Sequence, residues 1–318
     1  MPQPSGGSEV HVDRALTDLS VRFDQSADQF IATKVFPQVG VRNRSDKYFV
    51  YDRAYWFRTD AQLRAPGTES AGSGFQLTTD DYACEVFAIH KDVDDQIVAN
   101  ADAALDLDRD ATEFVTQQIL QKKEQDWVTK FFGSSIWGTT VTGTTNFTVW
   151  SDAASTPIED IRTGITTIAQ NTAFRPNTLV IGPAVWQKLV DHPDFLDRIK
   201  YTQAGVVGPD LLASLLGLER VLIPWSVKNT AAEGATASYS FNYGSHALLC
   251  YVPPRAGLNV PAAGYTFTWT GLLGTGANGM RMKKFRMDHL NSDRVEGETA
   301  YNMKVVSTAL GYFFASAV

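Results

Sequence analysis

Residues 103–132 read AALDLDRDATEFVTQQILQKKEQDWVTKFF, a stretch that contains neither glycine nor proline. Acidic residues crowd its first turns and lysines follow later, an order that complements the helix dipole. Gly133 stands directly after the stretch, where a helix commonly ends. Apolar residues recur at a spacing of four or its multiples, namely Leu107, Ala111, Val115, Ile119, Trp127 and Phe131. The stretch therefore predicts an amphipathic helix of ~30 residues and ~45 Å, long enough to serve as a spine.

The chain before this helix reads as an arm followed by a hairpin. Residues 1–10 are small and polar, which predicts a loose arm. We expect a short helix over residues 26–33 and an extended segment over 34–37. Residues 46–58 are aromatic and basic and residues 59–74 are rich in turn-forming residues, a pattern that indicates two strands with a flexible tip. Such a hairpin is marginal in water unless another surface covers its aromatic face, and a second subunit could supply that surface.

A compact α/β module is predicted after the long helix. Residues 134–155 are rich in threonine and glycine, and we place a domain boundary near Ser151. Helical and strand-like segments then alternate from residue 156 to residue 270. The helical segments run from 156 to the residue before Arg175, from 183 to 190 and from 211 to 218, and the strand-like segments are 178–182, 221–225, 247–252 and 265–269. Further strand patterns lie within 75–98, before the long helix, and at 280–287 and 301–305.

Composition bounds the kind of protein. The chain has 318 residues, of which 44% are hydrophobic and 20% charged, so most of it should be globular. A formal net charge of −7 argues against tight, salt-driven binding of nucleic acid. The longest apolar run, Ala247 to Val252, is far shorter than the ~20 residues of a membrane span. Cys84 and Cys250 lie far apart in sequence and no secretory signal precedes them, so we expect a soluble protein in a reducing cytoplasm.

The residues that could carry chemistry form no recognised site. The five histidines are scattered without zinc-site spacing, and no Gly-x-Ser-x-Gly motif occurs. Residues 274–279 match Gly-x-Gly-x-x-Gly, but residues 280–287 alternate like a strand instead of opening a helix, which favours a hinge or hairpin loop. We therefore predict no catalytic residue, no cofactor and no metal. An α/β enzyme built on residues 156–270 is kept as an alternative, although no pocket residues can be named for it.

Two charge clusters of opposite sign lie on either side of the hairpin tip. Residues 42–64 contain six bases and three acids, a net charge of +3. Residues 80–113 contain eleven acids and two bases, a net charge of −9. One segment could bind the other on a neighbouring subunit. Alternatively, both are ordinary solvated faces, screened beyond ~10 Å.

The order of the predicted elements is itself a feature of the chain. An arm, an aromatic and basic hairpin, a strand, a spine-length helix, an inserted α/β module and a return to strands follow one another. Locally, residues 23–26 read FDQS, residues 35–37 read VFP and residues 175–182 read RPNTLVIG. The chain resembles the tailed-phage (Caudoviricetes) major capsid proteins with the Hong Kong 97-type fold, both in the order of its elements and in these local sequences. The resemblance extends from about Val12 to the end of the chain. The resemblance implies an α+β fold.

The resemblance implies four regions and a mechanical function. The four regions are an N-arm (1–41), an E-loop hairpin (42–79), a peripheral domain that carries the spine helix (80–150 and 275–318) and an inserted axial α/β domain (151–274). Subunits would form pentamers and hexamers of an icosahedral shell around the packaged genome, with each E-loop lying over a neighbour's peripheral domain. The predicted contact residues of the E-loop are Tyr48, Phe49, Tyr51, Arg53, Tyr55, Trp56 and Arg58. Their predicted acidic partners are Asp92, Asp94, Asp95, Asp106 and Asp108.

The resemblance also implies partners and a location. The partners are further copies of the chain, a portal protein, separate scaffolding, protease and decoration proteins, and packaged double-stranded DNA held by weak, non-specific contacts. The location is the virion capsid, after assembly in the cytoplasm of a bacterial host. Residues 59–74 contain no lysine, so we expect no Lys–Asn crosslink from the E-loop, and we expect no fused N-terminal scaffold. An encapsulin-like nanocompartment shell around a cargo enzyme is the alternative within the same fold.

Overall fold

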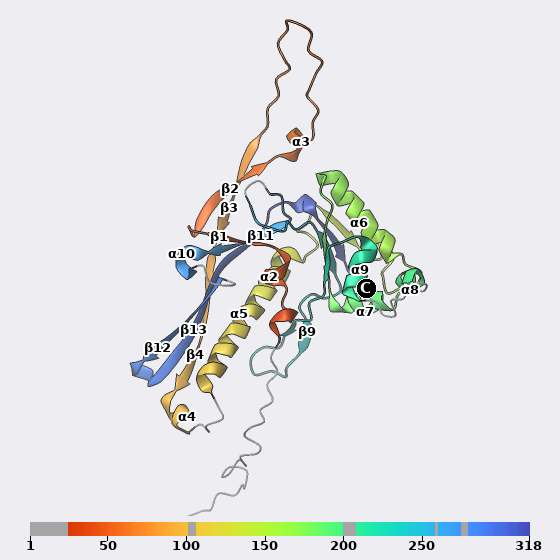
Figure 1. The fold of residues 1–318 in the computed structure, drawn as a ribbon. Coiled ribbons are helices and arrows are strands. Elements are labelled where there is room, and N and C mark those ends of the chain that lie inside the picture. The colour runs from red at the N-terminus through yellow and green to blue at the C-terminus, as the bar shows by residue number, and fades with distance from the viewer. Residues whose placement is uncertain (1–24, 101–105, 200–207, 258–259, 275–278) are drawn as a thin grey trace, which may run out of the picture.

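The computed structural model describes residues 25–100, 106–199, 208–257, 260–274 and 279–318. These residues form two five-stranded sheets and two separate two-stranded hairpins. The long helix α5 (Leu107–Phe131) runs along one of the five-stranded sheets, and one hairpin extends far from the body (Figure 1). The predicted α+β fold is confirmed.

The first large sheet, here called the peripheral sheet, is built around β13 (Ser292–Val305). Its strand order is β1-β11-β13-β12, and β4 also pairs with β13. The other strands are β1 (Gln38–Val41), β4 (Glu85–Asp94), β11 (Gly264–Trp269) and β12 (Met280–Met287). The α5 helix packs closely against β13 at Gly297, where an added Cβ would lie 2.5 Å from a methyl carbon of Val115. A glycine in β13 therefore sets how closely the helix approaches the sheet.

The second large sheet, here called the module sheet, has all of its central strands buried. Its order is β5-β14-β10-β6-β7. The strands are β5 (Thr139–Thr142), β6 (Thr178–Ile181), β7 (Arg220–Leu222), β10 (Ala247–Cys250) and β14 (Gly311–Ala315). Helices α6 (Pro157–Thr172), α7 (Pro183–Val190), α8 (Pro193–Ile199) and α9 (Pro209–Leu216) lie together beside it. Each of these four helices begins at a proline, which is tolerated in the first turn because that position needs no hydrogen-bond donor.

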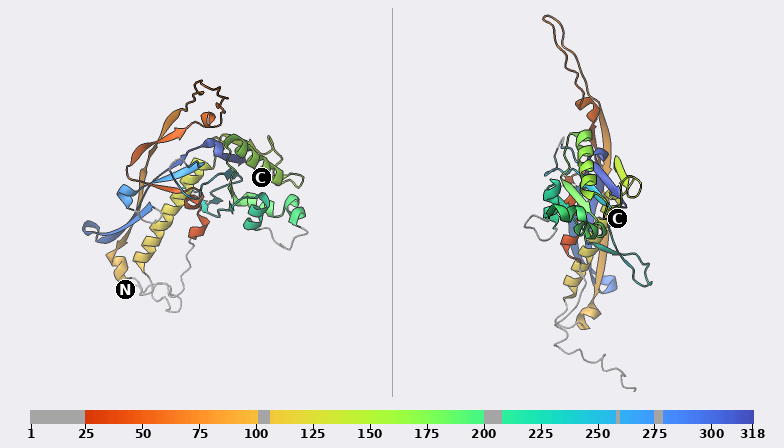
Figure 2. Two further views of the ribbon diagram at one scale, coloured as in Figure 1. Left: turned by 45° about the horizontal axis from the view of Figure 1, so that its top comes forward. Right: turned by 90° about the vertical axis from the view of Figure 1, so that its right-hand side faces the viewer.

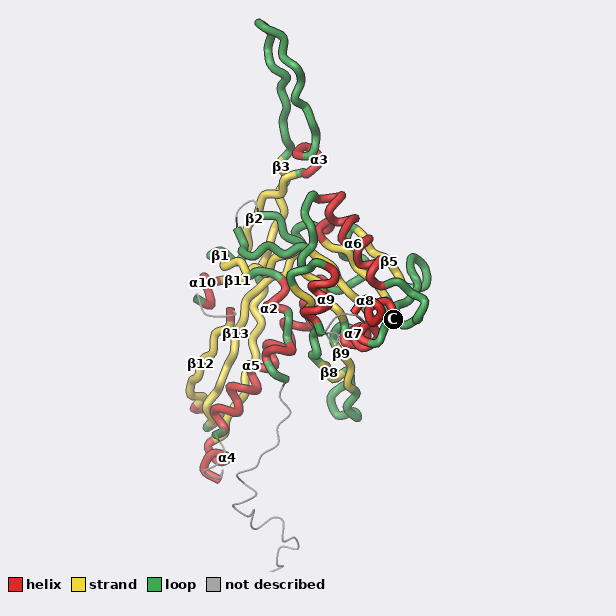
Figure 3. The backbone as a smooth tube through the Cα atoms, turned by 45° about the vertical axis from the view of Figure 1, so that its right-hand side comes forward, coloured by secondary structure: helices red, strands yellow, loops and turns green. Residues whose placement is uncertain are grey.

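Shorter elements connect the two sheets and form the projections. A projecting hairpin consists of β2 (Ser45–Tyr51), α3 (Arg53–Trp56) and β3 (Leu77–Ala83), and it points away from the body in the right-hand view of Figure 2. It contains most of the region predicted as the E-loop, and we use that name for it. A second hairpin, β8 (Val227–Asn229) with β9 (Tyr239–Phe241), stands out on the opposite side (Figure 3). The remaining elements are η1 (Ala27–Gln29), α2 (Ala32–Val35), α4 (Asp95–Asn100), α10 (Thr270–Leu273), η3 (Asp288–Leu290) and η4 (Thr308–Leu310).

The long helix is confirmed, although it begins later than predicted. The side chain of Asp106 accepts a hydrogen bond from the backbone N–H of Arg109, so Asp106 is the residue that caps the helix. The predicted helical residues 103–105 lie outside the described residues. Phe131 is the last helical residue, before Gly133.

Two other helix predictions were misplaced. The helix expected over 26–33 is instead a 3-10 turn followed by α2, and α2 includes Lys34 and Val35, which were expected to be extended. A side chain from α5 caps α2, a long-range contact that local sequence does not reveal. The helix expected over 211–218, stopped by Gly217, is α9, which begins two residues earlier at Pro209 and does end at Gly217, where the backbone adopts a φ of 66°.

Two strand predictions also changed. The strand-like section within 75–98 is two strands, β3 and β4, followed by the short helix α4. The strand expected over 221–225 ends at Leu222, two residues before Pro224, which has no N–H to donate. The β8–β9 hairpin was not predicted. Residues 275–278 of the Gly-x-Gly-x-x-Gly match lie outside the described residues, and the strand β12 begins at Met280, where a dinucleotide site would have a helix.

The four-region division stays a prediction, but the strands do not separate at its boundaries. The module sheet includes β5 and β14, which lie outside the predicted axial segment 151–274. Conversely, β11 lies within that segment and pairs with β13 of the peripheral sheet. The chain therefore passes between the two sheets several times, and the two share a continuous apolar core near the end of α5.

Candidate interaction surface

One face of the E-loop hairpin exposes aromatic side chains to solvent. β2 and β3 pair antiparallel from Ser45 with Ala83 to Tyr51 with Leu77. Because side chains alternate along a strand, Phe49 and Tyr51 point to the opposite face from Tyr48. The exposed fraction of the Phe49 side chain is 63%.

Where the ladder ends, three rings form an aromatic cluster, defined here as Tyr51, Trp56 and Phe75. Trp56 lies 5.7 Å from Phe75 and 6.2 Å from Tyr51 between ring centres. The exposed fractions are 61% for Trp56 and 60% for Phe75. These rings leave much apolar area in water, and exposed apolar patches mark interaction sites. Sequence reasoning missed Phe75 because it was assigned to the following strand. The pairing of Tyr51 with Leu77 shows that Phe75 lies just before β3, where its ring contacts Tyr51.

Tyr48 has a different position from the other predicted contact residues. Its ring centre lies 5.7 Å from that of Phe267 in β11, and its hydroxyl donates to Asp80 at 2.7 Å. Lys304 of β13 donates to the same carboxylate at 3.0 Å. Burial and the bond to Asp80 raise the pKa of Tyr48. Tyr48 therefore fixes the base of the hairpin to its own subunit and does not belong to the exposed face.

The predicted basic and aromatic residues of α3 lie beside the aromatic cluster. Arg53 begins α3, which is capped by the side chain of Asp52. The guanidinium of Arg58 lies 5.4 Å above the ring of Tyr55. A stacked guanidinium keeps its charge and its planar donors available at the surface. The structure thus brings Arg53, Tyr55 and Arg58 to the same end of the hairpin as Trp56.

The five predicted acidic partners all have roles within their own subunit. Asp92 accepts two bonds from Arg294, at 2.7 and 2.8 Å, which lower the pKa of its carboxyl. Asp95 pairs with Arg286, and Asp108 with Lys284 at 2.7 Å. Asp94 accepts from the backbone of Gln96 near the start of α4, and Asp106 caps α5. Much of this acidic charge is therefore compensated inside the subunit.

The basic side chains that compensate it come mainly from β12. Lys284 and Arg286 reach acids near α4 and α5, while Arg281 and Lys283 point to the other face of the sheet. There they bind Glu298, and the hydrogen bonds from Lys283 and Arg281 lower the pKa of that carboxyl to about 2. Sequence reasoning treated this run as an ordinary two-faced strand. The alternation of bases along β12 was the signal, but their partners could not be known without the pairing register.

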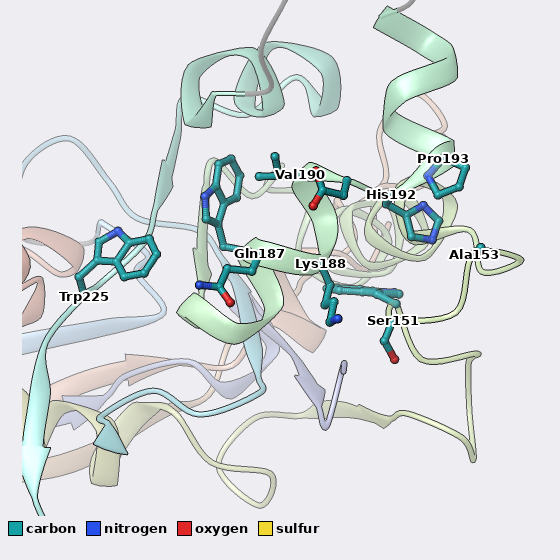
Figure 4. Close-up of a pocket in the computed structure, with 11 residues that line it drawn as sticks. Ser151, Ala153, Gln187, Lys188, Val190, His192, Pro193 and Trp225 are labelled. Atoms are coloured by element: carbon teal, nitrogen blue, oxygen red, sulfur yellow. The ribbon is translucent and has the colours of Figure 1, made fainter. Parts of the chain in front are cut away.

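A pocket and a serine–histidine pair lie close together near α7. A pocket of about 650 Å³ lies beside α7, with Trp225 at one end and His192 and Pro193 at the other (Figure 4). Ser155 Oγ is 3.0 Å from His192 Nε2. However, Nδ1 of His192 accepts from the backbone N–H of Asp194, so in the neutral ring Nε2 carries the proton and cannot take one from Ser155. The pair is a buried structural contact and not an activated nucleophile.

The described residues offer neither a metal site nor a reactive thiol. Within the described ranges, no group of His, Cys, Asp or Glu side chains is arranged to hold a metal ion. The part of the chain that is described has no helix both long and apolar enough to cross a membrane. Cys84 and Cys250 are buried as thiols, and burial raises their pKa values to about 11 and about 12. Such thiols are poor nucleophiles.

Sequence comparisons point to one kind of protein. A family model described as phage major capsid protein E matches residues 111–217, from α5 to the end of α9. The major capsid protein of Pseudomonas phage JBD67 is 26% identical over 313 residues, which cover 96% of this chain and 97% of that protein. The major capsid protein of Burkholderia phage BcepMu is 24% identical over 271 residues, which cover 82% and 84%.

Solved structures share the fold. A phage-related protein from Bordetella bronchiseptica RB50 has a TM-score of 0.69 at 19% identity, covering 92% of this chain and 94% of that one. The capsid of cyanophage P-SCSP1u gives a TM-score of 0.63 at 12% identity, covering 98% and 95%. An encapsulin complex from Synechococcus elongatus PCC 7942 gives 0.56 at 9% identity, covering 96% and 95%.

Proposed function

We propose that this chain, which is similar to phage major capsid proteins in sequence and has the Hong Kong 97-type fold, is a major capsid protein whose copies form the pentamers and hexamers of an icosahedral shell around a double-stranded DNA genome. A capsid protein associates with further copies of itself, and it is located in the virion capsid. The shell is closed by many repeated contacts, each of them weak, that add up through multivalency.

The exposed aromatic cluster of the E-loop is the observation that carries the proposed mode of assembly. Tyr51, Trp56 and Phe75 contact one another on the projecting hairpin, and their own subunit leaves much of their surface exposed. In the shell, the peripheral domain of a neighbouring copy covers these rings and Phe49. Arg53, Tyr55 and Arg58 lie at the edge of the same contact and orient it.

Charge contributes less than apolar contact at this interface. The candidate acidic partners on the neighbour are Asp92, Asp94, Asp95, Asp106 and Asp108. Since each already accepts a hydrogen bond in its own subunit, an arginine from a neighbour would have to share it. Exposed ion pairs contribute only about 0–1 kcal/mol each, whereas burial of one large aromatic side chain contributes about 1.5–3 kcal/mol.

The remaining partners follow from the proposed function. Assembly in the bacterial cytoplasm uses a portal protein at one vertex and separate scaffolding, protease or decoration proteins where the shell needs them. Contact with packaged DNA is weak, because the chain is net acidic and the bases of β12 are already paired. The absence of lysine from residues 59–74 supports a shell without E-loop crosslinks.

Removing the aromatic cluster tests the assembly contact. The double variant Trp56→Ser, Phe75→Ser should leave the subunit folded, because both rings are largely exposed, and should prevent closed shells at concentrations where the natural chain forms them. Sedimentation and electron microscopy measure assembly, and circular dichroism measures folding. Tyr239→Ser, which removes a ring that is 74% exposed outside the E-loop, is the matched control and should assemble. Normal shells from the double variant would refute the E-loop contact.

An encapsulin-like shell is the second candidate, since an encapsulin shares the fold. The contents of particles made in the native source separate the two functions. Nuclease-protected double-stranded DNA supports the capsid, whereas a protein cargo without DNA supports the encapsulin.

A further inference from the structure

The short helix α2 (Ala32–Val35) is held at its first residues by a buried carboxylate. Glu124 of α5 has no exposed surface and accepts from the backbone N–H of Ile31 at 3.0 Å and of Ala32 at 2.8 Å. A single helical turn is not stable by itself, because its first N–H groups lack partners and nucleation is costly. Glu124 supplies the missing acceptor, with the charge that a helix N-terminus favours.

The other end of α2 is held by a base from the module sheet. Arg220 of β7 donates to the backbone carbonyls of Lys34 and Val35, both at 2.9 Å. Its Nε also donates to Thr178 Oγ1 at 3.0 Å, which fixes the guanidinium. The last carbonyls of a helix carry partial negative charge, so a cation suits this end as an anion suits the other. One helical turn is thus clamped between a spine-helix carboxylate and a module-sheet guanidinium.

A third side chain fixes the chain just before α2. Gln25 donates to the carbonyl of Val227 at 2.8 Å and accepts from the N–H of the same residue at 3.0 Å. Gln121 of α5 donates to that carbonyl at 3.0 Å, and Tyr243 donates to Glu124 at 2.6 Å. The spine helix and the α/β module therefore meet on the same arm segment, defined here as residues 25–36.

Apolar contacts explain why the clamp lies where it does. Val35 and Phe36 are almost completely buried, and the ring of Phe36 lies 4.6 Å from Phe131 and 6.0 Å from Trp127 between centres. Figure 1 shows α2 beside α5 on the side that faces the module. Burial of these rings keeps water from the polar clamp, which strengthens its hydrogen bonds.

We propose that Glu124 and Arg220 are a pair of positioning residues that together lock the arm segment into the junction of spine helix and α/β module, so that releasing either end of α2 releases the whole segment. The lock determines where the N-arm leaves the body, and hence which neighbour the arm can reach. Only this last consequence depends on the proposed shell. The lock itself is a property of one subunit.

Hydrogen exchange of the unassembled subunit tests the lock. The variants Glu124→Gln and Arg220→Met should each raise the exchange rate of the amides of residues 25–36 by about tenfold or more, because each removes charged hydrogen bonds. Amides of β10, in the module core, should keep their protection. Arg281→Met is the matched control, since Arg281 also binds a carboxylate and a backbone carbonyl but within the peripheral region, and it should leave the arm segment unchanged.

The double variant decides whether the two ends act together. If they hold one cooperative unit, Glu124→Gln with Arg220→Met should increase exchange little beyond the larger single effect. Effects that multiply, or an equal rise in β10 that reports global unfolding, would overturn the proposal. So would normal exchange of the arm segment in both single variants. Failure of the subunit to form shells would refute the proposed function and leave this result unaffected.

Discussion

Two neighbouring residues of α5, Lys123 and Glu124, are buried although both can carry charge. The apolar spacing of the helix calls for an apolar residue at position 123, four residues after Ile119 and four before Trp127. The ammonium of Lys123 lies 5.5 Å from the centre of the Tyr301 ring, and its carbon chain occupies the apolar position. The stripe could be predicted from the sequence. The burial of a lysine and a glutamate within it could not, because their partners come from distant segments.

The pH dependence of stability should reveal Glu124. Burial raises the pKa of its carboxyl above the ordinary 4.5, although hydrogen bonds from Tyr243, Ile31 and Ala32 favour the charged form. The folded chain then holds this proton more tightly than the unfolded chain, so its contribution to stability is complete below pH 4.5 and is lost as the pH rises through the raised pKa. Relative to Glu124→Gln, the free energy of unfolding of the natural chain should fall over that window. Urea unfolding followed by tryptophan fluorescence measures it, and a difference that does not change with pH would contradict the assignment.

Lys123 should act in the opposite direction at higher pH. Burial lowers the pKa of its ammonium from 10.5 to about 8, so between these values the unfolded chain binds more protons. Stability of the natural chain should therefore rise with pH from about 8 to 10.5. Lys123→Met fills the same space without charge and should be the more stable protein at pH 7, with an advantage that shrinks by pH 10. An advantage that grows with pH would show that the ammonium is not destabilised by burial.

At the scale of elements, long periodic segments could be predicted and short ones could not. The α5 helix carries its apolar stripe and capping residues in its own sequence, and the buried strand over residues 178–181 is a short apolar run. By contrast, α2 depends on Glu124 and Arg220, and β8 is fixed by Gln25 and Gln121. Elements that depend on remote side chains leave no local pattern. The E-loop hairpin was predicted from composition, and Phe75 was missed because the pairing register was unknown.

The contact of α5 with β13 gives a prediction at this scale. An added Cβ at Gly297 would lie 2.5 Å from Val115 and 2.7 Å from Ile119, so Gly297→Ala forces the helix away from the sheet. Overpacking of this kind should lower the free energy of unfolding by about 1–3 kcal/mol. Gly72→Ala, in the E-loop where nothing lies within 4 Å, is the control and should change stability by less than about 0.5 kcal/mol. Equal stability of the two variants in urea unfolding would contradict the close packing.

At the scale of the whole molecule, the shape assigns assembly to projections and stability to the body. The projecting E-loop leaves much of its aromatic cluster exposed, whereas three of the predicted acidic partners, Asp92, Asp95 and Asp108, are paired with bases of their own subunit. Assembly should therefore depend weakly on salt. Raising the ionic strength from about 0.1 M to about 1 M shortens the screening length from about 10 Å to about 3 Å, yet the concentration needed for shells should change less than about tenfold. Light scattering measures the concentration at which shells form. Dissociation of the shells in salt would assign the contact to ion pairs.

Electron cryomicroscopy of particles from the native source tests the proposed function most directly, with nucleic acid measured in the same fraction. We predict closed icosahedral shells of pentamers and hexamers that contain nuclease-protected double-stranded DNA, with Trp56 and Phe75 of each subunit seated on the peripheral domain of a neighbour. Subunits that remain monomers or dimers, or shells in which those rings face solvent, would contradict it.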